Sequence, residues 1–183
     1  MKTYQFKNTL FDYFNEKATL AFPELTDKIF RERLKVKKPD YPFIMLKSGE
    51  RVRINKRFEK YQTSNGDNIR VQYSIPITFE VHALKETPSD AEKFADEIID
   101  FVEQFFISDE QTHSELSAKG IVINELLCSG VRDCGSVTTT SQEFIREIDI
   151  VFEFEDIRTI SSEAGKEVDF DIIALTDHKP HNA

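Results

Sequence analysis

Histidine and cysteine are the side chains of this 183-residue chain best suited to catalysis or metal binding. Of the four histidines, only His178 and His181 stand at a spacing, H-x-x-H, that lets two imidazoles share a metal on a helix. Pro180 lies between them, so we expect an irregular segment and no metal site. Cys128 and Cys134 form neither a C-x-x-C pair nor a zinc pattern, and cytosolic proteins rarely carry disulfides. We expect two ordinary thiols.

An enzyme needs a nucleophile, a base and an orienting group that converge. The sequence contains no P-loop, no dinucleotide-binding glycine pattern, no H-E-x-x-H and no G-x-S-x-G. Asp and Glu are abundant, but they alternate along predicted strands as solubilising charges do. We therefore expect no catalytic residue, no metal and no cofactor. A metal-dependent nuclease stays open as an alternative, because carboxylates from distant strands can gather in space; a bound divalent metal would favour it.

Charge is distributed unevenly along the chain. The net charge is −9, yet residues 28–60 hold 12 Lys or Arg against 4 Asp or Glu. Acidic clusters lie at 86–115 and 143–171. Opposite charges on two faces of one subunit can set the register of a contact between copies. One alternative is that these charges only cover solvated faces of strands and helices that happen to differ in sign. DNA binding through the basic segment is another, which the overall acidity and the missing aromatic stacking pattern oppose.

Apolar residues predict two amphipathic helices. They recur at steps of three and four over 4–20 and again over 89–106. Thr87 or Ser89 is the expected N-cap of the second helix. Residues 108–118 are read as a short polar helix. No run of 18 apolar residues exists and the N-terminus lacks a secretory signal, so we expect no membrane span and a protein made in the cytosol.

A period of two predicts antiparallel strands. The longest run covers 69–84, after a hairpin turn at Asn65-Gly66-Asp67. Pro76 within that run predicts a bulge or a free edge, because proline cannot donate to the ladder. In the last strand, Phe and Ile residues share one face and carboxylates the other. A polar loop is expected over 129–141. The other predicted strands are 43–47, 51–60, 120–127 and 144–157.

These elements predict an α+β fold. We expect a single domain over residues 1–160, with a mostly antiparallel sheet flanked by an N-terminal helix and a central amphipathic helix. Residues 161–183 are expected to be a partly disordered extension.

The order of the elements is a pattern of pleats and turns. After the N-terminal helix it is carried by Tyr41-Pro42-Phe43, Phe79-Glu80-Val81-His82-Ala83, Ala91 to Phe106, Gly120-Ile121-Val122-Ile123, Gly130-Val131-Arg132-Asp133 and Arg146-Glu147-Ile148-Asp149-Ile150-Val151-Phe152. Over residues 5–158 this pattern resembles the tail terminator (neck or tail-completion) proteins of tailed bacteriophages. Residues after 160 lie outside the likeness.

The resemblance implies a structural virion protein at the head–tail interface, assembled in the host cytoplasm. Its subunits would form a ring, commonly of six, that caps the head-proximal end of the tail tube. The isolated protein can still be a monomer, because such rings often close only on a tube end. The ring would stop tube polymerisation and provide the surface on which the head docks. The implied partners are further copies of the chain, the tail tube protein and head–tail connector proteins, without a membrane, a cofactor or sequence-specific nucleic acid binding. Another connector or adaptor protein stays open as an alternative.

A head-to-tail ring joins two different faces of one subunit, which fits the uneven charge. We therefore predict contacts between a basic stripe on one subunit and acidic faces on the next. The predicted contact residues are Arg51, Arg53, Lys56, Arg57 and Lys60 in the basic stripe, and Asp96, Asp100, Glu103, Arg132, Asp133, Glu147, Asp149 and Glu153 in the acidic faces and the loop beside them.

Overall fold

Two long strands form the centre of the structure, a computed structural model that describes residues 1–31, 39–54, 59–63, 66–134, 136–137 and 142–160. The helices are α1 (Thr3–Ala21), α2 (Pro88–Glu103) and α3 (Glu110–Ala118), with short helical turns η1 (Pro23–Leu25), η2 (Gln104–Ser108) and η3 (Glu125–Leu127). The strands are β1 (Ile29–Arg31), β2 (Phe43–Ser48), β3 (Val52–Arg53), β4 (Glu59–Thr63), β5 (Gly66–Ala83), β6 (Ile121–Ile123), β7 (Arg132–Asp133), β8 (Ser136–Val137) and β9 (Gln142–Ile160).

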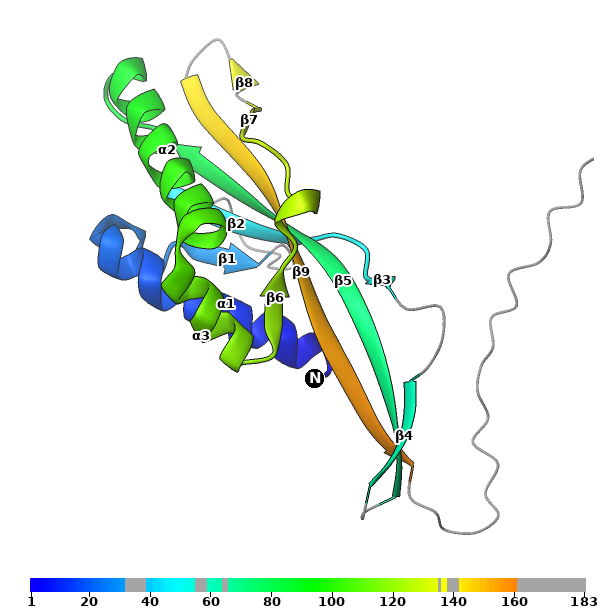
Figure 1. Cartoon of the computed structure of the whole chain (residues 1–183). Coiled ribbons are helices and arrows are strands. Elements are labelled where there is room, and N and C mark those ends of the chain that lie inside the picture. Colours follow the sequence, from blue (N-terminus) through cyan, green and yellow to red (C-terminus); the bar gives the residue numbers. More distant parts are fainter. Residues whose placement is uncertain (32–38, 55–58, 64–65, 135, 138–141, 161–183) are drawn as a thin grey trace, which may run out of the picture.

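The sheet has the strand order β1-β2-β5-β9-β6 (Figure 1). Strands β5 and β9 pair antiparallel along almost their whole length, from Asp67 opposite Ile160 to Ala83 opposite Phe144. Short strands extend this pair: β3 and β4 lie beside β5, and β7 and β8 lie beside β9. Strands β1 and β2 run parallel, whereas the other pairs of described strands are antiparallel. The predicted α+β fold with a mostly antiparallel sheet is confirmed.

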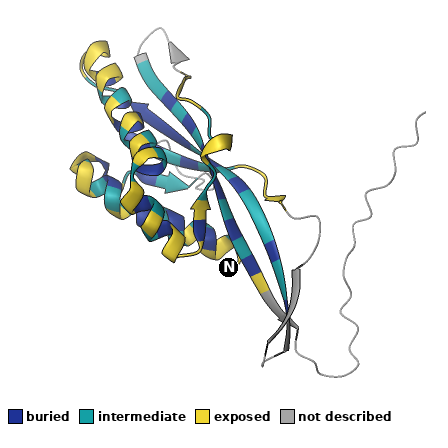
Figure 2. Ribbon diagram, viewed as in Figure 1, coloured by how far each residue is buried: buried dark blue, intermediate teal, exposed yellow. Residues whose placement is uncertain are grey.

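The helices cover one face of the sheet, and the core lies between them (Figures 1 and 2). The period of two along β5 and β9 turns the apolar side chains toward α1 and α2. Phe79 of β5 is fully buried, with its ring 4.9 Å from that of Phe14 in α1 and 5.0 Å from that of Phe106 in η2. Phe6 of α1 stacks on Phe154 of β9 at 4.6 Å. The opposite face of the sheet carries mainly polar side chains.

The predicted central helix is present and ends in an unusual turn. Thr87 is its N-cap, because its hydroxyl accepts a hydrogen bond from the backbone N–H of Asp90. The α-helix ends at Glu103, and η2 follows as a π-helical turn. The wider turn lets two neighbouring side chains, Phe105 and Phe106, both enter the core. Asp109 then caps α3 by accepting from Thr112, whose hydroxyl lowers the pKa of the Asp109 carboxyl.

The predicted strand over 51–60 is wrong, because two strands lie in this region. Arg53 pairs with Tyr73 and Glu59 pairs with Arg70, so the five residues 54–58 stand opposite the two residues 71–72. A continuous ladder cannot accommodate that excess. Residues 55–58 lie outside the described part.

The predicted hairpin turn at Asn65-Gly66-Asp67 overlaps β5. Gly66 pairs with Thr63 and Asp67 pairs with Gln62, so both residues belong to the strand. Residues 64–65 lie outside the described part.

The predicted strand over 120–127 is shorter than expected. Strand β6 ends at Ile123, and the chain then bonds to β9 by irregular contacts. The backbone N–H of Asn124 donates to the carbonyl of Val151, and the backbone N–H of Val151 donates to the sulfur of Cys128. The thiol therefore takes the place of a strand carbonyl, and η3 forms between the two contacts. Residues 129–141, expected to be a loop, contain β7 and β8.

Gly49 and Pro76 meet where β2 ends and β3 has not yet begun. The Gly49 N–H donates to the Pro76 carbonyl at 2.9 Å. Proline has no backbone N–H to donate, and this edge of Pro76 faces the gap between β2 and β3, where no strand residue needs that donor. A bulge or a free edge was predicted at Pro76. Residues 49–51 stand opposite residues 75–76 between the pairs Ser48–Ile77 and Val52–Ser74, which is a bulge, and β5 has no free edge there because Pro76 also pairs with Val151 of β9. A Cβ at position 49 would lie 2.6 Å from the Pro76 Cγ, closer than real contacts allow.

We expect Gly49→Ala to lower the free energy of unfolding by about 1–2 kcal/mol, because the methyl group must displace the proline ring. Urea unfolding of the purified chain measures it. Gly130→Ala is the matched control, since a Cβ at Gly130 meets no atom within 4 Å. Equal stability of the two variants would show that the gap closes less tightly than the structure indicates.

Candidate assembly surfaces

A polar network lies on the face of the sheet opposite the helices. Arg132 is held on β7 by pairing with β9, and its guanidinium lies 2.7 Å from the Asp149 carboxylate and 3.5 Å from that of Glu147. The hydroxyl of Thr78 donates to the other oxygen of Asp149 at 2.6 Å. Sequence reasoning assigned Arg132, Glu147 and Asp149 to contacts between subunits. The structure brings them together within one chain.

The Arg132 guanidinium and the Thr78 hydroxyl hold the pKa of the Asp149 carboxyl below its usual range. Its unfolded-state pKa is about 3.9, so ionised Asp149 stabilises the fold above that pH, and this contribution is lost as the pH falls through the folded-state pKa. We expect Arg132→Gln to raise the pKa of Asp149 and to move acid unfolding to higher pH. Carboxyl-carbon NMR titration measures the first effect and circular dichroism the second.

Lys93→Gln is the control for this titration, because Lys93 forms only an exposed pair with Glu97 on α2. It should change neither quantity. An unchanged Asp149 titration in Arg132→Gln would mean that the guanidinium does not set this pKa.

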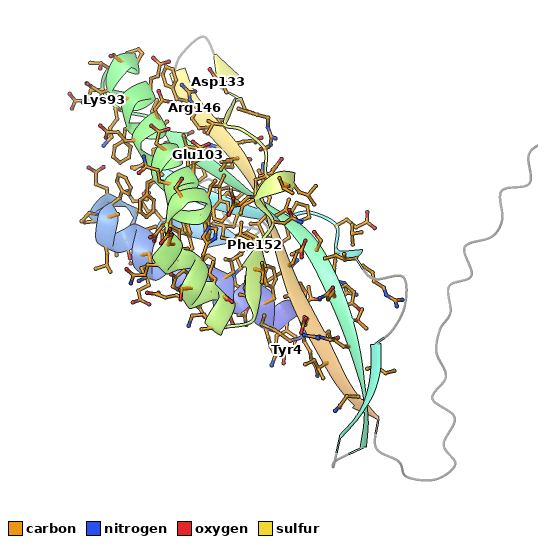
Figure 3. All side chains as sticks on the ribbon, viewed as in Figure 1. Tyr4, Lys93, Glu103, Asp133, Arg146 and Phe152 are labelled. Atoms are coloured by element: carbon orange, nitrogen blue, oxygen red, sulfur yellow. The ribbon has the colours of Figure 1, made fainter. Side chains whose placement is uncertain are left out.

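Arg146 forms a second network, on the helix-covered face (Figure 3). Its side chain is 8% exposed and reaches carboxylates on two other elements. Its Nε donates to Asp96 of α2 at 2.6 Å, its Nη1 lies 2.9 Å from Asp133 of β7, and its Nη2 donates to Glu92 of α2 at 3.4 Å. The network therefore ties α2 and β7 to β9. Sequence reasoning missed Arg146, although an arginine among the apolar positions of β9 was a visible signal.

A third cluster joins β2, β5 and the start of β9. Buried His82 lies between the carboxylates of Glu80 and Glu143, and Lys47 pairs with Glu80. The ring of Phe43 stacks on the imidazole, with the ring centres 4.2 Å apart. Stacking and burial hold these groups together across three strands. Within the described residues, no three His, Cys, Asp or Glu side chains are arranged to hold a metal ion.

The remaining candidates for chemistry are separated from one another. Cys128 and Cys134 are free thiols, and burial raises the pKa of both, so both are protonated and weakly nucleophilic at neutral pH. His113 contacts the carbonyl of Phe106 and lies 3.6 Å from Glu125. His178 and His181 lie outside the described residues.

The predicted basic stripe is only partly described. Arg51 lies over the Tyr73 ring, 4.2 Å from its centre, and donates to the Thr3 hydroxyl. Arg53 is exposed on β3, and Lys60 belongs to β4. Lys56 and Arg57 lie outside the described residues.

The remaining acidic candidates lie on two elements. Asp100 is exposed on α2, and Glu103 is half-buried at its end. Glu153 accepts from the Asn124 amide at 2.5 Å.

An arm of paired strands extends from the body of the molecule. The ends of β5 and β9, with β4, run beyond the helices (Figure 1). Along the outer edge of β9, Ser129 bonds Asp149, β6 bonds residues 152–154, and the N-terminal amine of Met1 bonds the Glu155 carbonyl. Beyond Glu155, no described strand pairs with this edge. Open strand edges are templates for pairing with another chain.

Comparison with protein-family models finds no matching family, and a search of curated proteins finds no similar sequence. Among the described residues, no helix is both long and apolar enough to cross a membrane.

Proposed function

We propose that the chain is a structural subunit of a tailed bacteriophage that forms a ring at the head-proximal end of the tail tube. In this role it stops polymerisation of the tube and provides the surface on which the head docks. Its partners are further copies of itself, the tail tube protein and a head–tail connector protein. A ring of six subunits is the number that the resemblance favours.

The observation that carries the proposal is the arm formed by β4, β5 and β9. It projects from a helix-covered body and ends in an open strand edge within the described residues. Such an arm can reach past the boundary of its own subunit, and a strand edge can pair with a neighbour. Surfaces of different kinds on different sides of one subunit favour head-to-tail contacts, which close into rings when the rotation permits.

The charged side chains support the same proposal. Arg132, Arg146 and His82 each join separate elements of the fold through carboxylates. They fix the shape of the subunit, and a rigid shape is what a ring contact requires. The acidic face beside β9 remains partly exposed at Glu153 and Glu155.

The experiment is to interrupt the coding sequence in the phage that carries it. The proposal expects lysates that contain filled heads without tails and tubes of irregular length, and complementation with the intact chain should restore joined particles. Electron microscopy of the lysate distinguishes these outcomes. Normal joined particles without the protein would contradict the proposal.

A further inference from the structure

The most exposed large apolar side chain among the described residues, Leu126, lies on η3, at the outer edge of the sheet next to β6. Leu126 is 96% exposed and Leu127 is 59% exposed. The neighbouring Glu125 is also exposed. We call these three residues the leucine knob. Adjacent exposed apolar side chains are typical of a contact surface, whereas scattered single ones need no explanation.

A cavity of about 540 Å³ lies near the opposite edge of the sheet, between α1 and the strands β1 and β2. Buried Leu10, Leu46 and Ile77 belong to its lining, and the exposed ring of Tyr4 lies at its mouth. Lys7 and Arg31 add positive charge to the lining. The Arg31 guanidinium is held over the Phe11 ring, 4.3 Å from its centre, and donates to Asn8 at 2.6 Å.

The leucine knob and the cavity match in three respects. The knob presents two leucine side chains, and the cavity volume of about 540 Å³ is larger than the volume of two leucine side chains. The knob carries a carboxylate at Glu125, and the cavity carries cations at Lys7 and Arg31. The knob lies next to β6 and the cavity lies next to β1, and these two strands are the opposite edges of the sheet. A surface and its complement on opposite sides of one subunit make a head-to-tail contact between copies.

We propose that the leucine knob of one copy inserts into the α1–β2 cavity of the next copy. This contact rests on the proposed function, because it is the joint from which a ring would be built. The leucines supply apolar burial, and Glu125 meets Lys7 and Arg31 at the mouth of the cavity. Rim charges of this kind orient a contact more than they strengthen it.

Disulfide trapping tests the contact directly. One full-length copy carries Leu126→Cys and a second carries Tyr4→Cys, both with Cys134→Ser. They are mixed and oxidised gently, and the covalent dimer is measured by denaturing electrophoresis. The matched control replaces Tyr4→Cys with Leu20→Cys, at a residue that is 74% exposed at the other end of α1. The proposal expects the mixed dimer with Tyr4→Cys to exceed the Leu20→Cys control and each single variant alone.

A charged substitution provides the second readout. Leu126→Asp should weaken self-association at least about tenfold, measured by sedimentation over a range of concentrations, since an aspartate cannot enter the cavity without losing its hydration. Leu20→Asp should leave it unchanged. Trapping no stronger than the control, or equal association of the two variants, would overturn the contact. Particles that fail to join without the protein would then still support the proposed function, so the two failures are distinguishable.

Discussion

Replacing Phe79 with alanine is expected to lower the free energy of unfolding by about 3–5 kcal/mol. Phe79 is fully buried at the centre of β5, and its ring contacts Phe14 of α1 and Phe106 of η2. Removing it opens a cavity between the sheet and two helical elements, and the flanking rings are too rigid to fill it. Equilibrium unfolding in urea measures the loss.

Tyr4→Ala is the control for this substitution, because Tyr4 is 60% exposed near the start of α1. Its effect should stay within about 0.5 kcal/mol. A Phe79→Ala protein as stable as Tyr4→Ala would mean that β5 does not turn this face toward the helices.

The second large effect is expected for Arg146→Ala, which should lower the free energy of unfolding by about 2–4 kcal/mol. Removing one partner of a fully buried ion pair costs about 3–5 kcal/mol, and the carboxylates here regain some hydration because they are about half exposed. The substitution leaves Asp96, Asp133 and Glu92 close together without their cation. Urea unfolding at neutral pH measures this effect.

Arg146→Lys is expected to fall between the wild type and Arg146→Ala, because an ammonium keeps the charge but lacks the planar fork of the guanidinium. Lys93→Ala, which breaks only an exposed pair on α2, should cost less than about 0.5 kcal/mol. If Arg146→Ala and Lys93→Ala are equally stable, the Arg146 network does not hold α2 and β7 against β9.

The long strands and helices could be predicted because their periodicity is local. Fifteen residues of alternation around Phe79 specify a half-buried strand whatever its neighbours are, and the apolar stripe of α2 specifies a helix in the same way. The pairing of β5 with β9 could not be predicted, because the separation of the paired residues runs from Ala83–Phe144 to Asp67–Ile160 and no local pattern specifies the register over such distances along the chain. The parallel pairing of β1 with β2 could not be predicted either, because no local pattern specifies which strands pair.

The polar networks show what alternation leaves undecided. It placed Glu147 and Asp149 on one face of β9, but it could not show that Arg132 from a predicted loop would lie on the same face and pair with them. The apolar side chains of Leu126 and Leu127 also led to the prediction of a strand through residue 127, whereas both residues belong to the helical turn η3. In the proposed head-to-tail contact, both leucine side chains are buried in the cavity of the next copy, which accounts for their apolar character.

Electron microscopy of phage tail tubes incubated with the gold-labelled, full-length chain tests the proposed role most directly. Gold is expected at one end of each tube only, with closed rings in end-on views, and capped tubes are expected not to grow after tube subunits are added. Gold along the length of the tubes, or tubes that bear no label and keep growing while the protein remains folded, would contradict it.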